Sequence, residues 1–463
     1  MHDGALVLGI DSSTQSTKAL LVRADDGTVV EQRDARHPDG SEVDPRAWLD
    51  ALDDAAGPLL ERASAVAVGG QQHGMVTLVE NGAPVREALL WNDTRSADAA
   101  EDLVAELGGP QACADATGSV FVASYTITKL RWLRDHEPGN ARRVARILLP
   151  HDYLTWHLAG RPSEPTTDRG DASGTGYYST RDDAWLPDLV THALGRALPM
   201  PRVPDPYETV GHHGDTVIAP GTGDNMAAAL ALDLDPGDVA VSIGTSGVAS
   251  AVVDAPVADG TGMVSGFADA TGRYLPLACI LNAARILELA GRTLGVDHDA
   301  LADLALSAPA GANGLTFLPY LDGERTPNRP DATGTLHGLT TRTSRADIAR
   351  ASVEGLLCAL ADAIDAVVAA TGVRPRRALL VGGGARNAAV RTLAPAVLGI
   401  PVVVPDAGEY VALGAARQAA WALEGSERPP AWTVPAGDVL DAEPCSQVRA
   451  AYAELRDRTE PWS

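Results

Sequence analysis

Length, composition and charge restrict the classes of protein to which this sequence can belong. The chain has 463 residues, 45% of them hydrophobic, and a formal net charge of −24; the length favours two domains, and the charge opposes binding to nucleic acid. Because the sequence shows no long apolar run, no export signal and no C-x-x-C pair among its four cysteines, we expect a cytoplasmic protein without membrane spans, a disulfide framework or a structural zinc site.

The first predicted element is a hairpin. An apolar strand over residues 5–10 leads into the polar turn Asp11–Lys18, and a second apolar strand covers residues 19–22. A strand-like segment at 65–68 and a helix-like segment at 97–107 follow. This alternation of strand and helix patterns predicts an α/β class.

A second hairpin over residues 237–253 repeats the plan of the first, with the turn Gly244–Gly247. A helix at 348–370, a strand at 378–381, a loop at 424–435 and a helix at 446–456 complete the prediction. The repeat predicts two similar domains, 1–224 and 225–463, with a ligand cleft between them.

Both hairpin turns have side chains that suit phosphate. The first carries Asp11, five hydroxyl groups and Lys18, and small residues let backbone N–H groups approach phosphate oxygens. Asp11 is a candidate ligand for Mg²⁺. Either turn alone is more typical of a solvated hairpin, but the pair predicts a phosphate clamp.

A third glycine-rich turn begins at Gly382, after the strand at 378–381. Its glycines permit close approach to a flat ligand such as adenine, although a plain strand-to-helix turn explains them as well. The sequence contains no Walker A motif, and Met226 breaks the dinucleotide fingerprint that begins at Gly221.

Asp224 follows a glycine turn and precedes an alanine-rich helix. It is a candidate general base that takes a proton from an attacking hydroxyl, and the alternative is an N-cap. The polar loops 71–74 and 91–95 could contact a polyol or be ordinary loops, and His73 alone is more typical of a structural histidine.

Taken together, these residues resemble the FGGY family of carbohydrate kinases over nearly the whole chain. The matching motifs are Gly9-Ile10-Asp11, Gly70-Gln71-Gln72-His73-Gly74, Leu90-Trp91-Asn92-Asp93, Leu149-Pro150-His151-Asp152-Tyr153, Gly223-Asp224-Asn225, Gly244-Thr245-Ser246-Gly247, Gly323-Glu324-Arg325-Thr326-Pro327, Gly382-Gly383-Gly384-Ala385-Arg386 and Ala412-Leu413-Gly414-Ala415-Ala416. The resemblance implies two ribonuclease H-like, actin-type domains, the first binding mainly the sugar and the second binding mainly MgATP.

The resemblance and the loop chemistry together assign the candidate site. Asp224 is expected to be the catalytic base and Asp11 the metal ligand. The expected sugar contacts are Gln72, His73, Asn225, Trp91 and Asp93. The expected ATP contacts are Thr14, Lys18, Gly244, Thr245, Ser246, Gly383, Gly384 and Asn387.

The implied reaction is phosphorylation of D-xylulose by ATP, in a protein that is expected to form a homodimer. Two departures from the family pattern bear on this: Ser13 replaces a frequent glycine in the first turn, and Gln72 stands where some relatives have methionine. The alternatives are a kinase for another ketose or pentitol, and a non-catalytic sugar sensor of the same fold.

Overall fold

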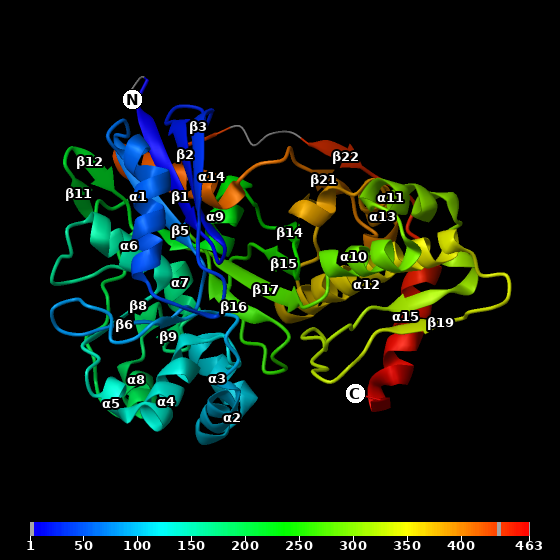
Figure 1. Cartoon of the computed structure of the whole chain (residues 1–463), viewed down its shortest axis with the longest axis horizontal. Coiled ribbons are helices and arrows are strands. Elements are labelled where there is room, and N and C mark those ends of the chain that lie inside the picture. Colours follow the sequence, from blue (N-terminus) through cyan, green and yellow to red (C-terminus); the bar gives the residue numbers. More distant parts are fainter. Residues whose placement is uncertain (1–3, 433–436, 463) are drawn as a thin grey trace. The chain divides into compact units, whose positions relative to one another are not determined.

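The computed structural model describes residues 4–432 and 437–462 (Figure 1). The chain forms two compact units, each built from separate segments. The first unit contains Met1–Asp233, Asp254–Leu275 and Gly408–Val434, and the second contains Leu234–Val253, Pro276–Ala407 and Pro435–Ser463.

The first unit is built on a seven-stranded sheet in the order β11-β12-β5-β1-β2-β3, with β13 paired to β5. Its strands are β1 (Leu6–Ser12), β2 (Ser16–Arg23), β3 (Val29–Arg36), β5 (Ala65–Gly70), β11 (Gly211–His213), β12 (Thr216–Ile218) and β13 (Thr222–Gly223). β1 and β2 form the predicted antiparallel hairpin, and β5 runs parallel to β1.

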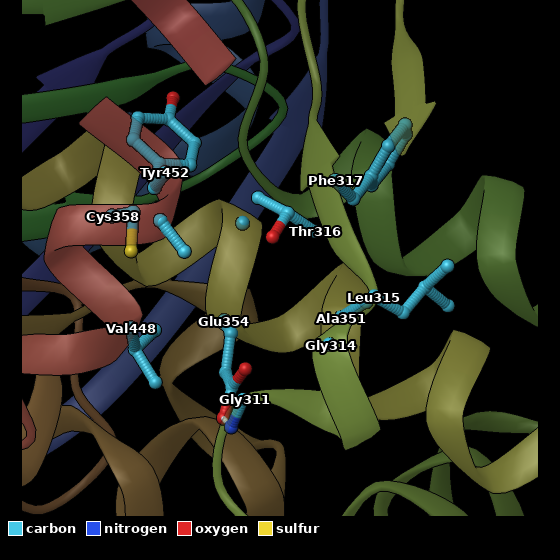
Figure 2. A pocket seen from close by; sticks show the side chains of 12 residues that line it. Gly311, Gly314, Leu315, Thr316, Phe317, Ala351, Glu354, Cys358, Val448 and Tyr452 are labelled. Atoms are coloured by element: carbon cyan, nitrogen blue, oxygen red, sulfur yellow. Dashed lines mark hydrogen bonds between the residues drawn. The ribbon is translucent and has the colours of Figure 1, made fainter. Parts of the chain in front are cut away.

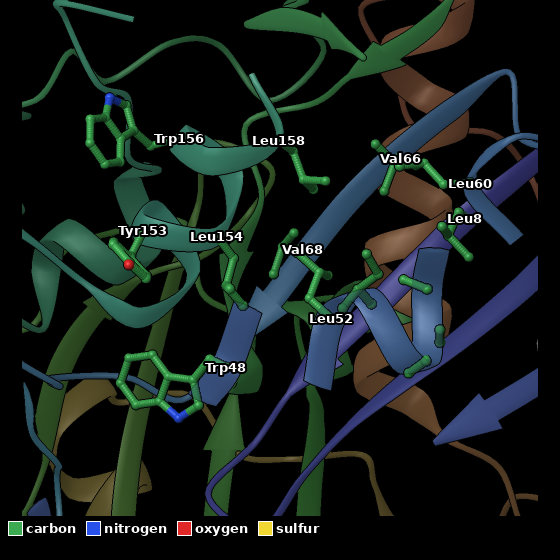
Figure 3. Close-up of a cluster of buried hydrophobic side chains, with 14 of the residues drawn as sticks. Leu8, Trp48, Leu52, Leu60, Val66, Val68, Tyr153, Leu154, Trp156 and Leu158 are labelled. Carbon is green, nitrogen blue, oxygen red and sulfur yellow. The ribbon is translucent and has the colours of Figure 1, made fainter. Parts of the chain in front are cut away.

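Alternate residues of the central strands bury opposite faces of this sheet. On one face, Leu8, Val66 and Val68 pack with Trp48 of α1 (Arg46–Leu60) and with α6 (Pro150–Leu158) (Figure 3). These large side chains form a continuous hydrophobic core.

The opposite face is covered by α14 (Tyr410–Glu424), which lies along β1 (Figure 1). A Cβ atom on Gly9 would lie 1.9 Å from the carbonyl oxygen of Ala412, and one on Gly414 would lie 1.8 Å from that of Ala227 in α9 (Asp224–Ala231). The two glycines therefore let strand and helices approach at backbone contact.

The second unit repeats this topology with β17 (Tyr274–Ile280), β15 (Gly247–Ala251), β14 (Asp238–Ile243), β20 (Arg377–Val381), β21 (Val402–Val404) and β22 (Asp438–Leu440), adjacent in that order. β14 and β15 form the second predicted hairpin, and β20 runs parallel to β14. Strand order and direction match β3-β2-β1-β5-β12-β11 of the first unit. The predicted internal repeat is confirmed.

The remaining elements of the first unit are β4 (Glu42–Val43), β6 (Val76–Leu78), β7 (Ala88–Leu89), α2 (Ala97–Glu106), α3 (Pro110–Thr117), α4 (Thr126–His136), α5 (Pro138–Ala141), β8 (Arg146–Leu148), α7 (Arg169–Ser173), β9 (Tyr178–Ser179), β10 (Ala184–Trp185), α8 (Pro187–Leu194) and β16 (Ser265–Ala268). Those of the second unit are α10 (Ala284–Leu294), α11 (His298–Ser307), β18 (Thr316–Leu318), β19 (Thr335–His337), α12 (Arg345–Thr371), α13 (Ala388–Leu398) and α15 (Ser446–Thr459), with short 3-10 turns at Ala312–Gly314, Gly383–Arg386 and Glu460–Trp462.

The helices predicted at 97–107, 348–370 and 446–456 are confirmed as α2, α12 and α15. The compact units divide after Asp233, whereas the predicted domain boundary follows Asp224; α9 stays with the first unit because it packs on α14. Residues 433–435 of the predicted C-terminal loop lie outside the described residues. Within the described ranges no helix has the length and apolar character needed to cross a bilayer, and the four cysteines are free.

Candidate active site

Three strands of the first unit end side by side and bring the predicted residues together. Gly69 of β5 is flanked by Asp11 of β1 and by Thr222 of β13, and all three strands run parallel. Gln72 and Asp224 follow directly after β5 and β13. Since ligands of α/β sheets bind beyond the carboxyl ends of the strands, this edge is the candidate site.

Asp224 is the first residue of α9, and the N-cap position belongs to Gly223. The alternative interpretation of Asp224 as an N-cap is therefore wrong. Oδ1 of Asp224 accepts hydrogen bonds from the backbone N–H of Asn225 at 2.8 Å and from its Nδ2 at 2.9 Å. Burial raises the pKa of Asp224 to about 6, against the effect of these hydrogen bonds; its carboxylate is thus ionised at neutral pH and can accept a proton.

Gln72 and Asn225 are joined directly, because Asn225 Nδ2 also donates to Gln72 Oε1 at 2.9 Å. Gly223 makes room for this pair, since a Cβ atom there would lie 2.9 Å from Cγ of Gln72. Nε2 of Gln72 is buried and has no hydrogen-bond partner among the described residues. A buried donor without a partner is costly, so this atom points to a ligand that accepts a hydrogen bond.

Asp11 is buried on β1 and faces a mixed set of charges. Burial and the neighbouring charge of Asp224 raise the pKa of Asp11 to about 7, Lys18 opposes the shift, and Glu409 adds to it. Nζ of Lys18 pairs with Glu409 Oε2 at 2.6 Å. Oδ1 of Asp11 has no hydrogen-bond partner among the described residues. A carboxylate oxygen of this kind in an acidic setting suits a divalent cation.

The first phosphate turn closes without glycine. The backbone N–H and the hydroxyl of Ser13 both donate to the carbonyl of Ser16, at 3.1 and 3.0 Å. The indole N–H of Trp91 donates to Oγ1 of Thr14 at 2.9 Å. The structure thus brings together a residue predicted for sugar and one predicted for phosphate.

His73 and Asp93 are held by the protein itself. Nδ1 of His73 donates to the carbonyl of Gly174 at 2.6 Å, and the ring packs against Tyr125 with centroids 4.9 Å apart. Asp93 accepts from Ser41 at 2.8 Å and from Nε of Arg95 at 2.8 Å. Although burial opposes the shift, these hydrogen bonds lower the pKa of Asp93. Both side chains shape the loop around Gln72 and Trp91, and their contact with sugar stays a prediction.

In the second unit, the turn at Gly244, Thr245 and Ser246 follows β14. The backbone N–H of Gly244 donates to the carbonyl of Ser246 at 3.0 Å, and the carbonyls of Thr245 and Gly244 accept from Ala283 and Ala284 at 3.1 and 2.9 Å. The side chain of Thr245 is exposed. The carbonyls of this turn are thus held by backbone hydrogen bonds while Thr245 is exposed, and its contact with phosphate stays a prediction.

The three members of the predicted adenosine loop have different surroundings. Gly383 is exposed with open space beside it, whereas a Cβ atom on Gly384 would lie 2.3 Å from Cγ2 of Ile243. Asn387 is the N-cap of α13, and its Oδ1 accepts from Ala389 and Val390 at 3.0 and 3.2 Å. Gly383 is therefore the one most open to a ligand, while Gly384 and Asn387 also serve the fold.

Sequence reasoning missed three residues that support these elements. Glu409 pairs with Lys18. Asp168 accepts a 2.8 Å hydrogen bond from the hydroxyl of Thr222, and Glu324 accepts from the backbone N–H of Leu281 at 2.6 Å, next to the residues that hold the Gly244 turn. Glu324 lies within a motif that could have drawn attention to it, whereas no local pattern marks Asp168 or Glu409.

A cavity of about 80 Å³ lies elsewhere in the second unit, between α12, α15 and β18 (Figure 2). Glu354, Cys358 and Tyr452 line it, and none of the predicted site residues does. It is separate from the candidate site.

Comparison with known proteins also divides the chain into an N-terminal and a C-terminal part. The sequence model of the N-terminal domain of the FGGY family of carbohydrate kinases matches residues 6–230, and that of the C-terminal domain matches residues 239–423. A xylulose kinase of Streptomyces coelicolor is 47% identical over 460 residues, covering 95% of this chain and 93% of that protein.

Solved structures agree with the sequence matches. The crystal structure of xylulose kinase from Bifidobacterium adolescentis has a TM-score of 0.91 and 44% identity, covering 98% of this chain and 99% of that chain. Plasmodium falciparum glycerol kinase with ADP shares the fold at a TM-score of 0.85 and 19% identity, covering 98% of each chain. The predicted pair of actin-like domains is confirmed.

Proposed function

Because the chain belongs to the FGGY family of carbohydrate kinases, we propose that it transfers the γ-phosphoryl group of MgATP to a terminal hydroxyl of D-xylulose. The products are D-xylulose 5-phosphate and ADP. The observation that carries this proposal is the carboxylate of Asp224, hydrogen-bonded by Asn225, beside Nε2 of Gln72, which has no hydrogen-bond partner among the described residues. The names of the relatives above support D-xylulose as the sugar.

Asp224 is the proposed general base. As the sugar oxygen forms its bond to the γ-phosphorus, the hydroxyl proton passes to the Asp224 carboxylate, and the bond between that phosphorus and the bridging oxygen of ADP breaks. Placement at the start of a buried helix keeps the carboxylate in one position, which is what a base acting on a bound hydroxyl needs.

Sugar recognition falls to the polar groups around this base. Nε2 of Gln72 is the proposed donor to a sugar hydroxyl, and Asn225 orients the amide of Gln72 by donating to its oxygen. His73, Trp91 and Asp93 form the surrounding wall of the site. A pocket that hydrogen-bonds individual hydroxyls discriminates strongly between sugars.

ATP recognition is proposed for the two hairpin turns and the glycine loop. Thr14, Gly244, Thr245 and Ser246 would contact phosphates, and Gly383, with Gly384 and Asn387 beneath it, would contact adenosine. Asp11 would hold Mg²⁺, which neutralises charge on the transferred phosphoryl group. Lys18, paired with Glu409, would balance the charge around Asp11. Four free cysteines accord with the reducing cytoplasm, where ATP is available.

The test is ADP release by the purified protein with a panel of ketopentoses, ketohexoses and pentitols. D-Xylulose should give the highest kcat/KM, and a higher value for another sugar would overturn the substrate. Asp224→Asn should lower kcat by about 10²–10⁴-fold, while Asp215→Asn, an exposed carboxylate of the same unit, should keep the wild-type rate. An Asp224→Asn variant with more than about a tenth of the wild-type kcat would contradict the role of base.

A further inference from the structure

A buried cluster of one histidine and three aspartates lies in the first unit, outside the proposed catalytic groups. Nδ1 of His151 is 2.6 Å from Asp171 Oδ2, and its Nε2 is 3.1 Å from Asp152 Oδ1 and 3.7 Å from Asp168 Oδ1. All four side chains are buried. His151 and Asp152 begin α6, and Asp168 is the N-cap of α7.

Stability alone does not account for such a cluster. Taking charges out of water costs more than their mutual attraction commonly returns, and well-packed apolar residues in their place are often as stable. Although burial opposes the charge, Asp152 and Asp171 raise the pKa of His151 to about 9, so it is an imidazolium at neutral pH. It is the one positively charged side chain among the four of this cluster.

The cluster is in contact with the strand ends that carry the candidate site. A Cβ atom on Gly70 would lie 2.9 Å from Cβ of His151, and one on Gly221, whose φ is +83°, would lie 2.7 Å from Cδ2 of the same ring. Gly70 ends β5 two residues before Gln72, and Gly221 precedes β13 and Asp224. His151 thus packs against both segments.

Asp168 joins the cluster to β13 by a specific bond. Its Oδ2 accepts from the hydroxyl of Thr222 at 2.8 Å, and its two oxygens also accept from the backbone N–H groups of Gly170 and Asp171 at 2.8 and 3.0 Å. Asp168 is therefore fixed by the backbone at the start of α7 and by the nearby imidazolium of His151. In this fixed position it accepts the hydrogen bond from Thr222. Thr222 is fully buried and lies two residues before Asp224.

We propose that Asp168, fixed by His151, positions the catalytic base by holding the hydroxyl of Thr222, so that the first turn of α9 presents the Asp224 carboxylate in one orientation. This inference rests on the proposed function and adds Asp168 and Thr222 to it as positioning residues. A base displaced by about 1 Å can lose up to about 100-fold in rate while substrates still bind.

Three substitutions of Thr222 separate its hydroxyl from its shape. Thr222→Val keeps the branched shape and removes the hydroxyl, Thr222→Ser keeps the hydroxyl, and Thr222→Ala removes both. Thr216→Val is the matched control, because Thr216 is a buried threonine of the same sheet whose hydroxyl donates to the carbonyl of Ala63 at 2.8 Å.

We expect Thr222→Val and Thr222→Ala to lower kcat about tenfold or more, with KM for sugar and for ATP within about twofold of wild type. Thr222→Ser should keep at least about half of kcat, and Thr216→Val should change only the melting temperature. If Thr222→Val does not fold, the comparison of Thr222→Ser with Thr222→Ala tests the proposal by itself.

The proposal is overturned if Thr222→Ala and Thr222→Ser have the same kcat, or if the Thr222→Val loss appears in KM instead of kcat. Such a result with Asp224→Asn still inactive would reject only the positioning role. A fully active Asp224→Asn variant would instead reject the proposed base.

Discussion

Nδ2 of Asn225 lies 2.9 Å from Oε1 of Gln72, and this hydrogen bond joins α9, which begins at Asp224, to the loop that follows β5. The bond fixes which end of the Gln72 amide faces Asn225. It leaves Nε2 of Gln72 as the group without a partner among the described residues.

Gln72→Ala should therefore weaken the use of sugar more than the use of ATP. We expect KM for the sugar to rise by about 10-fold or more, equivalent to about 1.4 kcal/mol or more of lost binding, and KM for ATP to stay within about twofold. Steady-state kinetics with each substrate varied measures both. Gln418→Ala, which removes another buried amide of the first unit, is the control; a larger rise in KM for ATP than for sugar in Gln72→Ala would place Gln72 away from the sugar.

The second phosphate turn depends on a buried carboxylate in the same unit. Glu324 accepts from the backbone of Leu281 at 2.6 Å and from Nδ2 of Asn282 at 3.0 Å, and the next two residues hold the carbonyls of the Gly244 turn. Glu324→Gln places an amide donor against these donors, so KM for ATP should rise by about 10-fold while KM for sugar is unchanged.

The control for Glu324→Gln is Glu354→Gln. Glu354 is also buried in the second unit and accepts a backbone N–H from Gly311 at 3.0 Å, beside the cavity in Figure 2. The Glu354→Gln substitution should lower the melting temperature and leave KM for ATP unchanged. Equal effects of the two substitutions on KM for ATP would show that Glu324 has no specific connection to the phosphate turn.

The contact between α14 and α9 predicts a large effect of a single methyl group. Gly414→Ala forces Cβ to within 1.8 Å of the Ala227 carbonyl oxygen unless the helices separate, so the free energy of unfolding should fall by about 3 kcal/mol or more. Gly139→Ala adds the same methyl group in α5 with no atom within 4 Å, and it should be neutral or stabilising by up to about 1 kcal/mol. Urea denaturation of both variants measures the difference, and equal stabilities would contradict the close packing.

The His151 cluster predicts a contribution to stability that decreases as pH rises. The folded pKa of His151 is about 9 against an ordinary 6.5, and burial raises those of Asp171 and Asp152 to about 7 and about 6. All three groups hold protons more tightly in the folded state, so their contribution is present at low pH and is lost through these values. Tyr177 also faces the cluster, and burial raises its pKa further from the neutral range.

Between pH 6.5 and 9.5 the excess free energy of unfolding of wild type over His151→Gln should decrease by about 1–3 kcal/mol, since each pKa unit is worth about 1.4 kcal/mol. The comparison is needed because burial lowers the pKa of Lys129 to about 7, which raises stability over the same range in both proteins. Denaturant titrations of both proteins across this range measure the difference. A difference between wild type and His151→Gln that stays constant or grows over this interval would contradict the assigned charges.

Much of the fold could be predicted because its signals are local. The turns at Asp11 and Gly244 each follow an apolar strand and precede another, so neighbouring residues define both hairpins. Asp224 was also readable as a candidate base from its glycine turn and the helix that follows it. That Gly223 and not Asp224 is the N-cap could not be predicted, because the N-cap position depends on backbone angles that either residue can adopt.

The supporting residues could not be predicted for a different reason. Asp168 and Thr222 are 54 positions apart, and Lys18 and Glu409 are 391 apart. The helix at 410–424 was not predicted, and local sequence periodicity would not say which sheet it covers. The backbone contacts at Gly9 and Gly414, together with the alanine side chains of α14 packed on the sheet, assign α14 to the first unit.

That assignment has a consequence for synthesis on the ribosome. The sheet of the first unit is translated early, yet the helix that covers one of its faces is encoded near the end of the message. A nascent chain folds domain by domain as each unit emerges. Here the face of β1 and β5 that packs against α14 stays exposed until residue 424 has left the exit tunnel. The unit that begins first is thus completed late, and its uncovered sheet is the surface that a chaperone would need to protect during translation.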